Sequence, residues 1–187
     1  MSDRFRELVE QNIGCVVILA GSGSDETHAT KLSRGDGKKT KGLQHYAIPH
    51  EVRVHSAHNN PGRVLEIVGE YDRLQGSLVY ITVAGGVDAL SGIVSRHTYR
   101  PVISCPPDAL SMAPNMSCLA NPFLSSNLYV TRPDNAARAI AQMFSLLNPI
   151  YRQRLQQEIS AKDAELIQED ERIRQLLRWC PTEEMKQ

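Results

Sequence analysis

The chain has 187 residues with 21 basic and 21 acidic side chains, so its formal net charge is zero. This length fits one compact domain with a sizeable core. The balanced charge provides no basic field for nucleic acid or an anionic membrane, and the apolar runs are too short to span a bilayer. The polar N-terminus lacks the apolar core of a secretory signal. We therefore expect a cytoplasmic protein that binds neither nucleic acid nor membrane.

The cysteines are few and scattered, without a C-x-x-C motif; they are Cys15, Cys105, Cys118 and Cys180. We expect reduced thiols that mainly pack in the protein interior. Cys105 is a conceivable nucleophile, but no base stands near it in the sequence.

Strand-like and helix-like segments alternate along most of the chain. Strands are expected at residues 15–20, 51–55, 78–84, 101–105 and 127–131. Helices are expected at residues 3–11, 26–32, 43–46 and 134–147, from Pro61 onward, and before His97. The run at 78–84 is continuously apolar, as in a strand covered on both faces, whereas 51–55 alternates like a half-buried strand. This pattern predicts a flavodoxin-like or Rossmann-like three-layer sandwich with a central parallel sheet.

Two segments differ from the alternating pattern. Residues 33–39 carry two glycines and a run of charge, which predicts an exposed, mobile insertion. Residues 151–178 form a long charged helix in which Lys162 and Glu169 interrupt the heptads. Its narrow apolar stripe consists of Leu155, Ile159, Leu166, Ile173 and Leu177. A stripe of this kind needs a partner surface, so we divide the chain into a flavodoxin-like domain at 1–149 and a helical oligomerisation arm at 150–187.

A loop suited to an anion follows the first strand, where residues 21–25 read G-S-G-S-D. Unpaired amides and the helix dipole favour a phosphate here, and Ser22 and Ser24 could donate hydrogen bonds to it. Asp25 could cap the next helix or accept from a sugar hydroxyl. A simple capping turn is the alternative. The loop lacks the lysine of a P-loop and the spacing of a dinucleotide fingerprint, which argues against ATP and NAD.

A loop suited to proton transfer follows the second strand, where residues 56–61 read S-A-H-N-N-P. Imidazole titrates near neutral pH, so His58 is a candidate general acid or base. The alternative is a loop histidine that only bonds the backbone. His55 and His58 are also spaced like some metal-binding pairs. Strand alternation directs His55 elsewhere, however, and no cysteine or carboxylate cluster stands beside the two, so we predict no metal.

The third strand ends in Gly85 and Gly86, which leave room for a ligand or for another stretch of backbone. A tight turn without a ligand is the alternative. Asp88 is suited to cap the helix that follows and needs no catalytic role.

Four motifs occur together in the order and nearly the spacing of one known family: G-S-G-S-D, S-A-H-x-x-P, V-A-G-G and P-V-I-S-C-P-P. On these motifs the chain resembles the aminoimidazole ribonucleotide carboxylase and mutase family of purine biosynthesis. The last motif resembles its class II branch, which uses carbon dioxide. The similarity runs from about Cys15 to Leu147, and the charged C-terminal helix resembles the family's subunit-wrapping tail. The resemblance implies a flavodoxin-like subunit in a homo-octamer, with active sites at subunit junctions and no metal, biotin or nucleotide cofactor.

The resemblance also implies roles for individual residues. His58 would move the proton at the imidazole carbon that gains or loses a carboxylate. Carbon dioxide would lie in a small dry pocket beside Gly85 and Gly86, where positioning supplies much of the rate. The other expected substrate contacts, which include those to the ribose 5-phosphate, come from Gly21, Ser22, Ser24, Asp25, Ser56 and Asn59.

Three positions differ from the family pattern. Asn59 stands where the family has a basic residue, Gly86 where class II has an arginine, and Ala120 where a further arginine occurs. Cations that could replace them are Arg63, Arg96 and Arg100.

The leading hypothesis is an enzyme that interconverts aminoimidazole ribonucleotide plus carbon dioxide with carboxyaminoimidazole ribonucleotide. A first alternative is a diverged paralogue that carboxylates or decarboxylates another phosphorylated or heterocyclic substrate. A second is an oligomeric binding protein that kept the fold without the chemistry, against which the retained Ser22, Asp25 and His58 argue.

Overall fold

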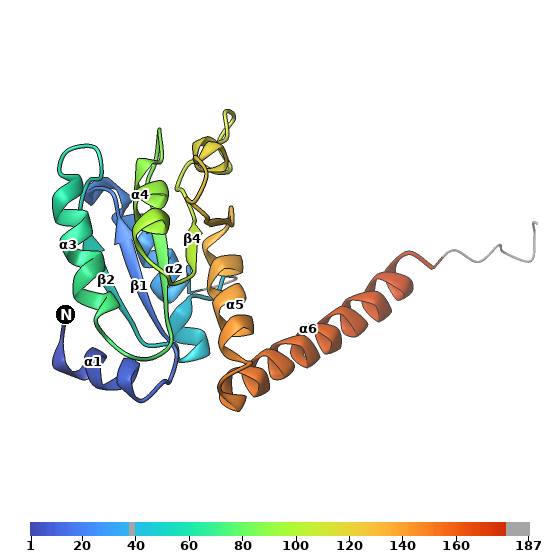
Figure 1. Ribbon diagram of the computed structural model, residues 1–187. Helices are drawn as coiled ribbons and strands as arrows, with labels where there is room; N and C mark the ends of the chain where they lie inside the picture. The colour runs from blue at the N-terminus through green and yellow to red at the C-terminus, as the bar shows by residue number, and fades with distance from the viewer. Residues whose placement is uncertain (38–39, 179–187) are drawn as a thin grey trace, which may run out of the picture.

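A parallel five-stranded sheet forms the centre of the molecule in the computed structural model, which describes residues 1–37 and 40–178 (Figure 1). The strands are β1 (Cys15–Ala20), β2 (His50–Val54), β3 (Leu78–Val83), β4 (Val102–Ser104) and β5 (Leu128–Tyr129). They lie in the order β2-β1-β3-β4-β5, and each neighbouring pair is parallel. This is the flavodoxin-like strand order, so the predicted fold is confirmed.

Helices cover both faces of the sheet. On one face lie α1 (Asp3–Glu10), α3 (Pro61–Asp72) and α4 (Ala89–His97). On the other lie α2 (Glu26–Arg34), α5 (Pro133–Phe144) and the start of α6 (Pro149–Leu176). Short 3₁₀ helices are η1 (Gly23–Asp25), η2 (Leu43–Tyr46) and η3 (Ser117–Ala120). None of the described helices is long and apolar enough to cross a membrane.

The inner and outer strands differ in burial as their positions require. Every residue of β1 and of β3 is buried, which confirms the expectation for a continuously apolar strand. The second strand alternates between half-buried and exposed residues, as expected. Its apolar side chains lie on the exposed side, however: Val52 and Val54 of this edge strand are 46% and 51% exposed. The fifth strand is also shorter than the predicted 127–131.

The segment predicted as an insertion begins later than expected. Helix α2 continues through Ser33 and ends at Arg34, and it is followed by Gly35, whose positive φ of 80° favours glycine. Asp36 and Thr40 then close a loop, since each backbone amide donates to the other residue's side chain at 2.9 Å. Lys38 and Lys39 lie outside the described residues. The expected mobility of this segment stays a prediction.

Helix α6 starts in the core and then leaves it (Figure 1). Tyr151 and Leu155 are buried, and the Tyr151 ring packs against Phe144 of α5. Farther along, the stripe residues Ile159 and Ile173 are 49% and 44% exposed. The sheet domain thus includes the first turns of α6. Residues 179–187 of the predicted arm, with Cys180, lie outside the described part of the chain.

Candidate active site

A polar pocket of about 250 Å³ lies at the carboxyl ends of β1, β2 and β3. Its lining comprises Gly21, Ser22, Ser24, Asp25, Ser56, Ala57, His58, Ala84, Gly85, Val87, Ala89 and Leu90. In this strand order the chain reverses direction across the sheet between β1 and β3. Ligands of open α/β sheets bind in the crevice that such a reversal creates. The pocket therefore lies where the fold itself predicts a ligand.

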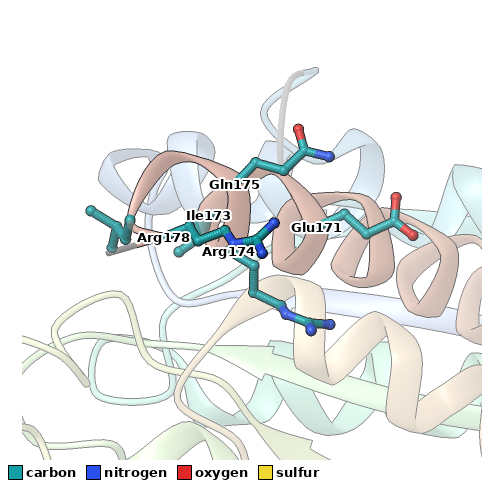
Figure 2. Close-up of a pocket in the computed structure, with 6 residues that line it drawn as sticks. Glu171, Ile173, Arg174, Gln175 and Arg178 are labelled. Atoms are coloured by element: carbon teal, nitrogen blue, oxygen red, sulfur yellow. The ribbon is translucent and has the colours of Figure 1, made fainter. Parts of the chain in front are cut away.

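A larger hollow, of about 920 Å³, occurs at the far end of α6 but offers no comparable chemistry. Figure 2 shows that Glu171, Arg174 and Gln175 come from the same helix and point in different directions. No strand end contributes to this hollow, and its side chains do not converge on a common point. We therefore place the candidate site in the polar pocket at the carboxyl ends of the strands.

The loop after β1 bonds mainly to itself. The Asp25 carboxylate oxygen Oδ2 accepts from the Ser22 amide at 2.9 Å and from the Ser22 hydroxyl at 3.1 Å. The hydroxyls of Ser22 and Ser24 are 2.6 Å apart. Gly21 passes close to the third strand, because a Cβ atom at this position would lie 3.2 Å from the Cβ of Ala84. The loop is thus a compact capping turn with hydroxyls at the pocket.

The loop after β2 presents an open histidine. His58 is exposed, and no hydrogen bond to its imidazole occurs within the described residues. The turn that carries it is held locally: the Asn59 amide donates to the Ser56 hydroxyl at 3.3 Å. Asn60 then caps α3 by accepting from the Arg63 amide at 3.0 Å. The imidazole is therefore free to exchange a proton with a ligand.

His55 does not join His58 in the pocket. Its ring nitrogen Nδ1 lies 3.2 Å from the carbonyl oxygen of Val54. Within residues 1–37 and 40–178, no group of three or more His, Cys, Asp or Glu is placed to hold a metal ion.

Seven of the nine residues predicted for the site line this pocket; they are Gly21, Ser22, Ser24, Asp25, Ser56, His58 and Gly85. The other two, Asn59 and Gly86, lie beside it but are not part of its lining. Their roles stay predictions.

Sequence reasoning missed the apolar part of the lining, which consists of Ala57, Ala84, Val87, Ala89 and Leu90. These side chains carry no chemical signature. Ala57, Ala84 and Val87 each adjoin a predicted site residue in the chain, so a search of every loop residue at the three strand ends would have found them. Ala89 and Leu90 belong to the first turn of α4, and only the fold brings them to the pocket.

None of the lining residues is a lysine or an arginine. Arg100 is buried at the opposite end of the sheet, where it bonds the Asp72 carboxylate and the carbonyl oxygen of Gly76. Arg63 donates to Glu66 at 2.6 Å on the exposed face of α3. Arg96 lies in the last turn of α4, away from the pocket lining. The arginines considered as replacements for the family's cations are therefore absent from this lining.

The structure supplies a partner for Cys105 that the sequence did not reveal. His28 Nε2 on α2 lies 3.4 Å from the Cys105 sulfur. Burial raises the pKa of the Cys105 thiol to about 12, and burial also lowers the pKa of His28. Both shifts favour the neutral forms, so the pair is a packing contact rather than a thiolate nucleophile. Cys15, Cys105 and Cys118 are all free and buried, as expected for packing thiols.

Comparisons with known proteins agree with this geometry. The model of the AIR carboxylase family matches residues 15–165. A phosphoribosylaminoimidazole carboxylase of Archaeoglobus fulgidus is 34% identical, over 84% of each chain. One from Treponema denticola is 32% identical, over 85% of this chain and 97% of its own.

A solved structure and a longer relative extend the comparison. The crystal structure of Treponema denticola PurE superimposes with a TM-score of 0.76 at 32% identity, covering 85% of this chain and 98% of that one. A bifunctional carboxylase and succinocarboxamide synthetase of Mus musculus is 33% identical, and the match covers 40% of its length. The match over all five strands, together with the relatives' coverage, shows that this chain belongs to the AIR carboxylase family.

Proposed function

We propose that this protein interconverts aminoimidazole ribonucleotide plus carbon dioxide with carboxyaminoimidazole ribonucleotide, with His58 as the general acid and base. The observation that carries the proposal is the polar pocket between β1 and β3, where the chain reverses its direction across the sheet. There an unbonded imidazole faces a loop of hydroxyls and a carboxylate in a member of the AIR carboxylase family.

In the carboxylation direction, the nucleophilic ring carbon attacks carbon dioxide and forms a carbon–carbon bond. The neutral imidazole of His58 then takes the proton from that ring carbon, which restores the aromatic ring. In the reverse direction the imidazolium protonates the ring carbon. The carbon–carbon bond breaks, its electron pair returns to the ring, and carbon dioxide leaves. The proposal invokes no metal, biotin or nucleotide cofactor.

The two other walls of the pocket suit the two ends of such a substrate. The hydroxyls of Ser22 and Ser24 lie at the start of α2, where the helix dipole also favours an anion. Ala84 and Gly85 offer little side-chain bulk, so carbon dioxide can lie close to the ring. Holding it there converts an encounter of two molecules into a reaction within one complex.

The test is decarboxylation of carboxyaminoimidazole ribonucleotide by the full chain and by His58→Asn. We expect release of carbon dioxide from the wild type and a loss of roughly a hundredfold or more in kcat for the variant. His55→Asn is the matched control, because His55 follows the same strand but does not line the pocket. An inactive wild type, or a His58→Asn variant as active as His55→Asn, would overturn the proposal.

The protein is also proposed to act as a homo-oligomer, with a homo-octamer as the specific expectation and α6 as its arm. The support is the apolar stripe of α6, whose residues beyond Leu155 no other element of the described subunit covers: Leu166, for example, is 49% exposed. Burial of such a stripe against another subunit is favourable at about 25 cal/mol per Å². A cytoplasmic location belongs to the same proposal and is supported by the free thiols of Cys15, Cys105 and Cys118, which suit a reducing compartment.

Light scattering tests the arm. Leu166→Ser with Ile173→Ser should lower the oligomeric mass, because both side chains belong to the apolar stripe. Gln168→Ser with Glu171→Ser is the matched control on the opposite side of α6 and should leave the mass unchanged. Equal masses for all three proteins would refute the assignment. A truncation must begin after Glu158, because this carboxylate accepts from the Tyr46 hydroxyl of the sheet domain at 3.0 Å.

A further inference from the structure

The turn at residues 84–88, one wall of the pocket, is held from behind by the segment that connects β4 with β5. Its front face contributes Ala84, Gly85 and Val87 to the pocket. Behind it, three polar side chains of the connecting segment bond the backbone of the turn. None of the three lines the pocket.

Asp108 makes the central contact. Its carboxylate oxygen Oδ2 accepts from the Gly86 amide at 2.9 Å. The same oxygen would lie 3.6 Å from a Cβ atom at Gly85, so the carboxylate packs directly against the wall. Gly86 itself has a φ of 68°, and a Cβ atom at this position would meet nothing within 4 Å. The side of Gly86 where a Cβ atom would lie is therefore open, and the residue is held through its backbone amide and carbonyl.

Ser117 and Asn115 bond the rest of the turn. The Ser117 hydroxyl oxygen accepts from the Asp88 amide at 2.7 Å. Its single proton lies within reach of the Gly86 carbonyl at 3.3 Å and of the Asn115 side-chain oxygen at 2.7 Å. The Asn115 side-chain amide in turn donates to the Ala84 carbonyl at 3.4 Å. The backbone is therefore held at Ala84, at Gly86 and at Asp88.

We propose that Asp108 is a positioning residue, which fixes the Gly85 wall of the pocket through the Gly86 amide and so sets the place of the carboxyl group or carbon dioxide. This inference rests on the proposed function. The residue acts through the wall and need not touch the substrate. A shift of the wall by a fraction of an ångström would change the alignment of the reacting carbon atoms, to which rates are sensitive.

The other oxygen of Asp108 shows which property of the side chain matters. Oδ1 is buried and has no hydrogen-bond partner in the described part of the chain. Burying an oxygen without a hydrogen bond lowers stability, so Oδ1 adds nothing to the bond that Oδ2 makes with the turn. The wall needs one acceptor for the Gly86 amide, which an asparagine side chain also provides.

Decarboxylation kinetics of three variants test the inference. Asp108→Ala removes the acceptor and should lower kcat roughly tenfold or more, with KM for carboxyaminoimidazole ribonucleotide within about twofold of wild type. Asp108→Asn keeps an acceptor and should restore kcat to within about threefold. Ser111→Ala is the matched control, because its hydroxyl donates to the Ala113 carbonyl in the same segment without contacting the turn.

The outcomes separate the inference from the proposed function. An inactive wild type overturns the proposed function. With an active wild type, an unchanged kcat for Asp108→Ala overturns the inference alone, and so does an Asp108→Asn loss as large as that of Asp108→Ala. Should Asp108→Ala fail to fold, Ser117→Ala tests the hold at the Asp88 amide. It is expected to lower kcat with little change in KM, and a wild-type kcat would again overturn the inference.

Discussion

The loops after β1 and β2 lie at the same edge of the sheet but use their polar groups in opposite ways. In the first, the Asp25 carboxylate is only 6% exposed and accepts two hydrogen bonds from Ser22. In the second, the His58 imidazole is exposed and bonds no described residue. We call the first loop closed, because its polar side chains bond to one another, and the second loop open, because the imidazole of its histidine bonds to none of the described residues.

The contrast shows that different residues of this small site fix its geometry and carry out its proton transfer. A buried carboxylate that accepts two bonds loses stability if one partner is removed, so Asp25 fixes the geometry of its loop. The His58 imidazole can gain or lose a proton without breaking a hydrogen bond to any of the residues that the structure describes, so His58 is suited to carry the proton. We therefore expect substitution of Asp25 to affect folding, and substitution of His58 to affect turnover.

The largest expected effect belongs to His58. Replacement by asparagine should lower kcat about 10²- to 10⁴-fold, the usual contribution of a general acid or base. The free energy of unfolding should stay within about 0.5 kcal/mol of wild type, because an exposed side chain without bonds stabilises little. Urea unfolding beside the decarboxylation assay measures both quantities. A loss of stability above that range would show that the second loop is closed as well.

Asp25→Ala tests the first loop. The substitution removes the charged acceptor of two partly buried hydrogen bonds from Ser22 and should lower the free energy of unfolding by about 1–3 kcal/mol. Asn59→Ala is the control, since this exposed side chain lies in the open loop and should change stability by less than about 0.5 kcal/mol. Equal unfolding curves for the two variants would remove the distinction between the loops.

Local features of the site were predictable from the sequence because their causes are local. The capping turn at 21–25 and the helix start at Asn60 follow from residues that bond within a few positions of themselves. The alternation of strands and helices also determined the parallel sheet, since parallel neighbours need crossovers.

Contacts between distant segments were not predictable. Asp108 lies 22 positions after the glycine whose amide it holds, and His28 lies 77 positions before Cys105. Nothing in either local sequence indicates these pairs, because they depend on how β4 and its following loop pack against other elements. Likewise, the exposure of Val52 follows from the edge position of β2, which alternation alone does not reveal.

A smaller effect is expected from placing a cation in the open loop. Asn59→Arg puts a guanidinium beside the pocket, where a charge-assisted bond to the substrate phosphate contributes roughly 1.5 kcal/mol. We expect about a tenfold lower KM for the ribonucleotide, with kcat little changed. Asn59→Gln, which lengthens the side chain without adding charge, is the control and should keep the wild-type KM. An equal KM for both variants would place the phosphate away from this loop.

The smallest expected effect concerns His28 on α2, the helix that follows the closed loop, and the pH dependence of the free energy of unfolding. Burial lowers the pKa of His28 below its ordinary value of 6.5. At pH values between the lowered pKa of His28 in the folded protein and its ordinary pKa of 6.5 in the unfolded chain, the unfolded chain binds more protons than the folded protein. The free energy of unfolding therefore rises with pH in that range. The contribution of neutral His28 is thus complete above about pH 6.5 and is lost as the pH falls through its lowered folded value.

His28→Gln removes this titration but keeps a polar side chain beside Cys105. From about pH 7.5 to about pH 5.5, the variant should therefore lose less unfolding free energy than the wild type. Urea unfolding at both pH values measures the difference, and the comparison of slopes cancels any constant cost of the substitution. Parallel losses in the two proteins would show that His28 is as accessible to protons in the folded protein as in the unfolded chain. The closed character of the first loop would then not extend into α2.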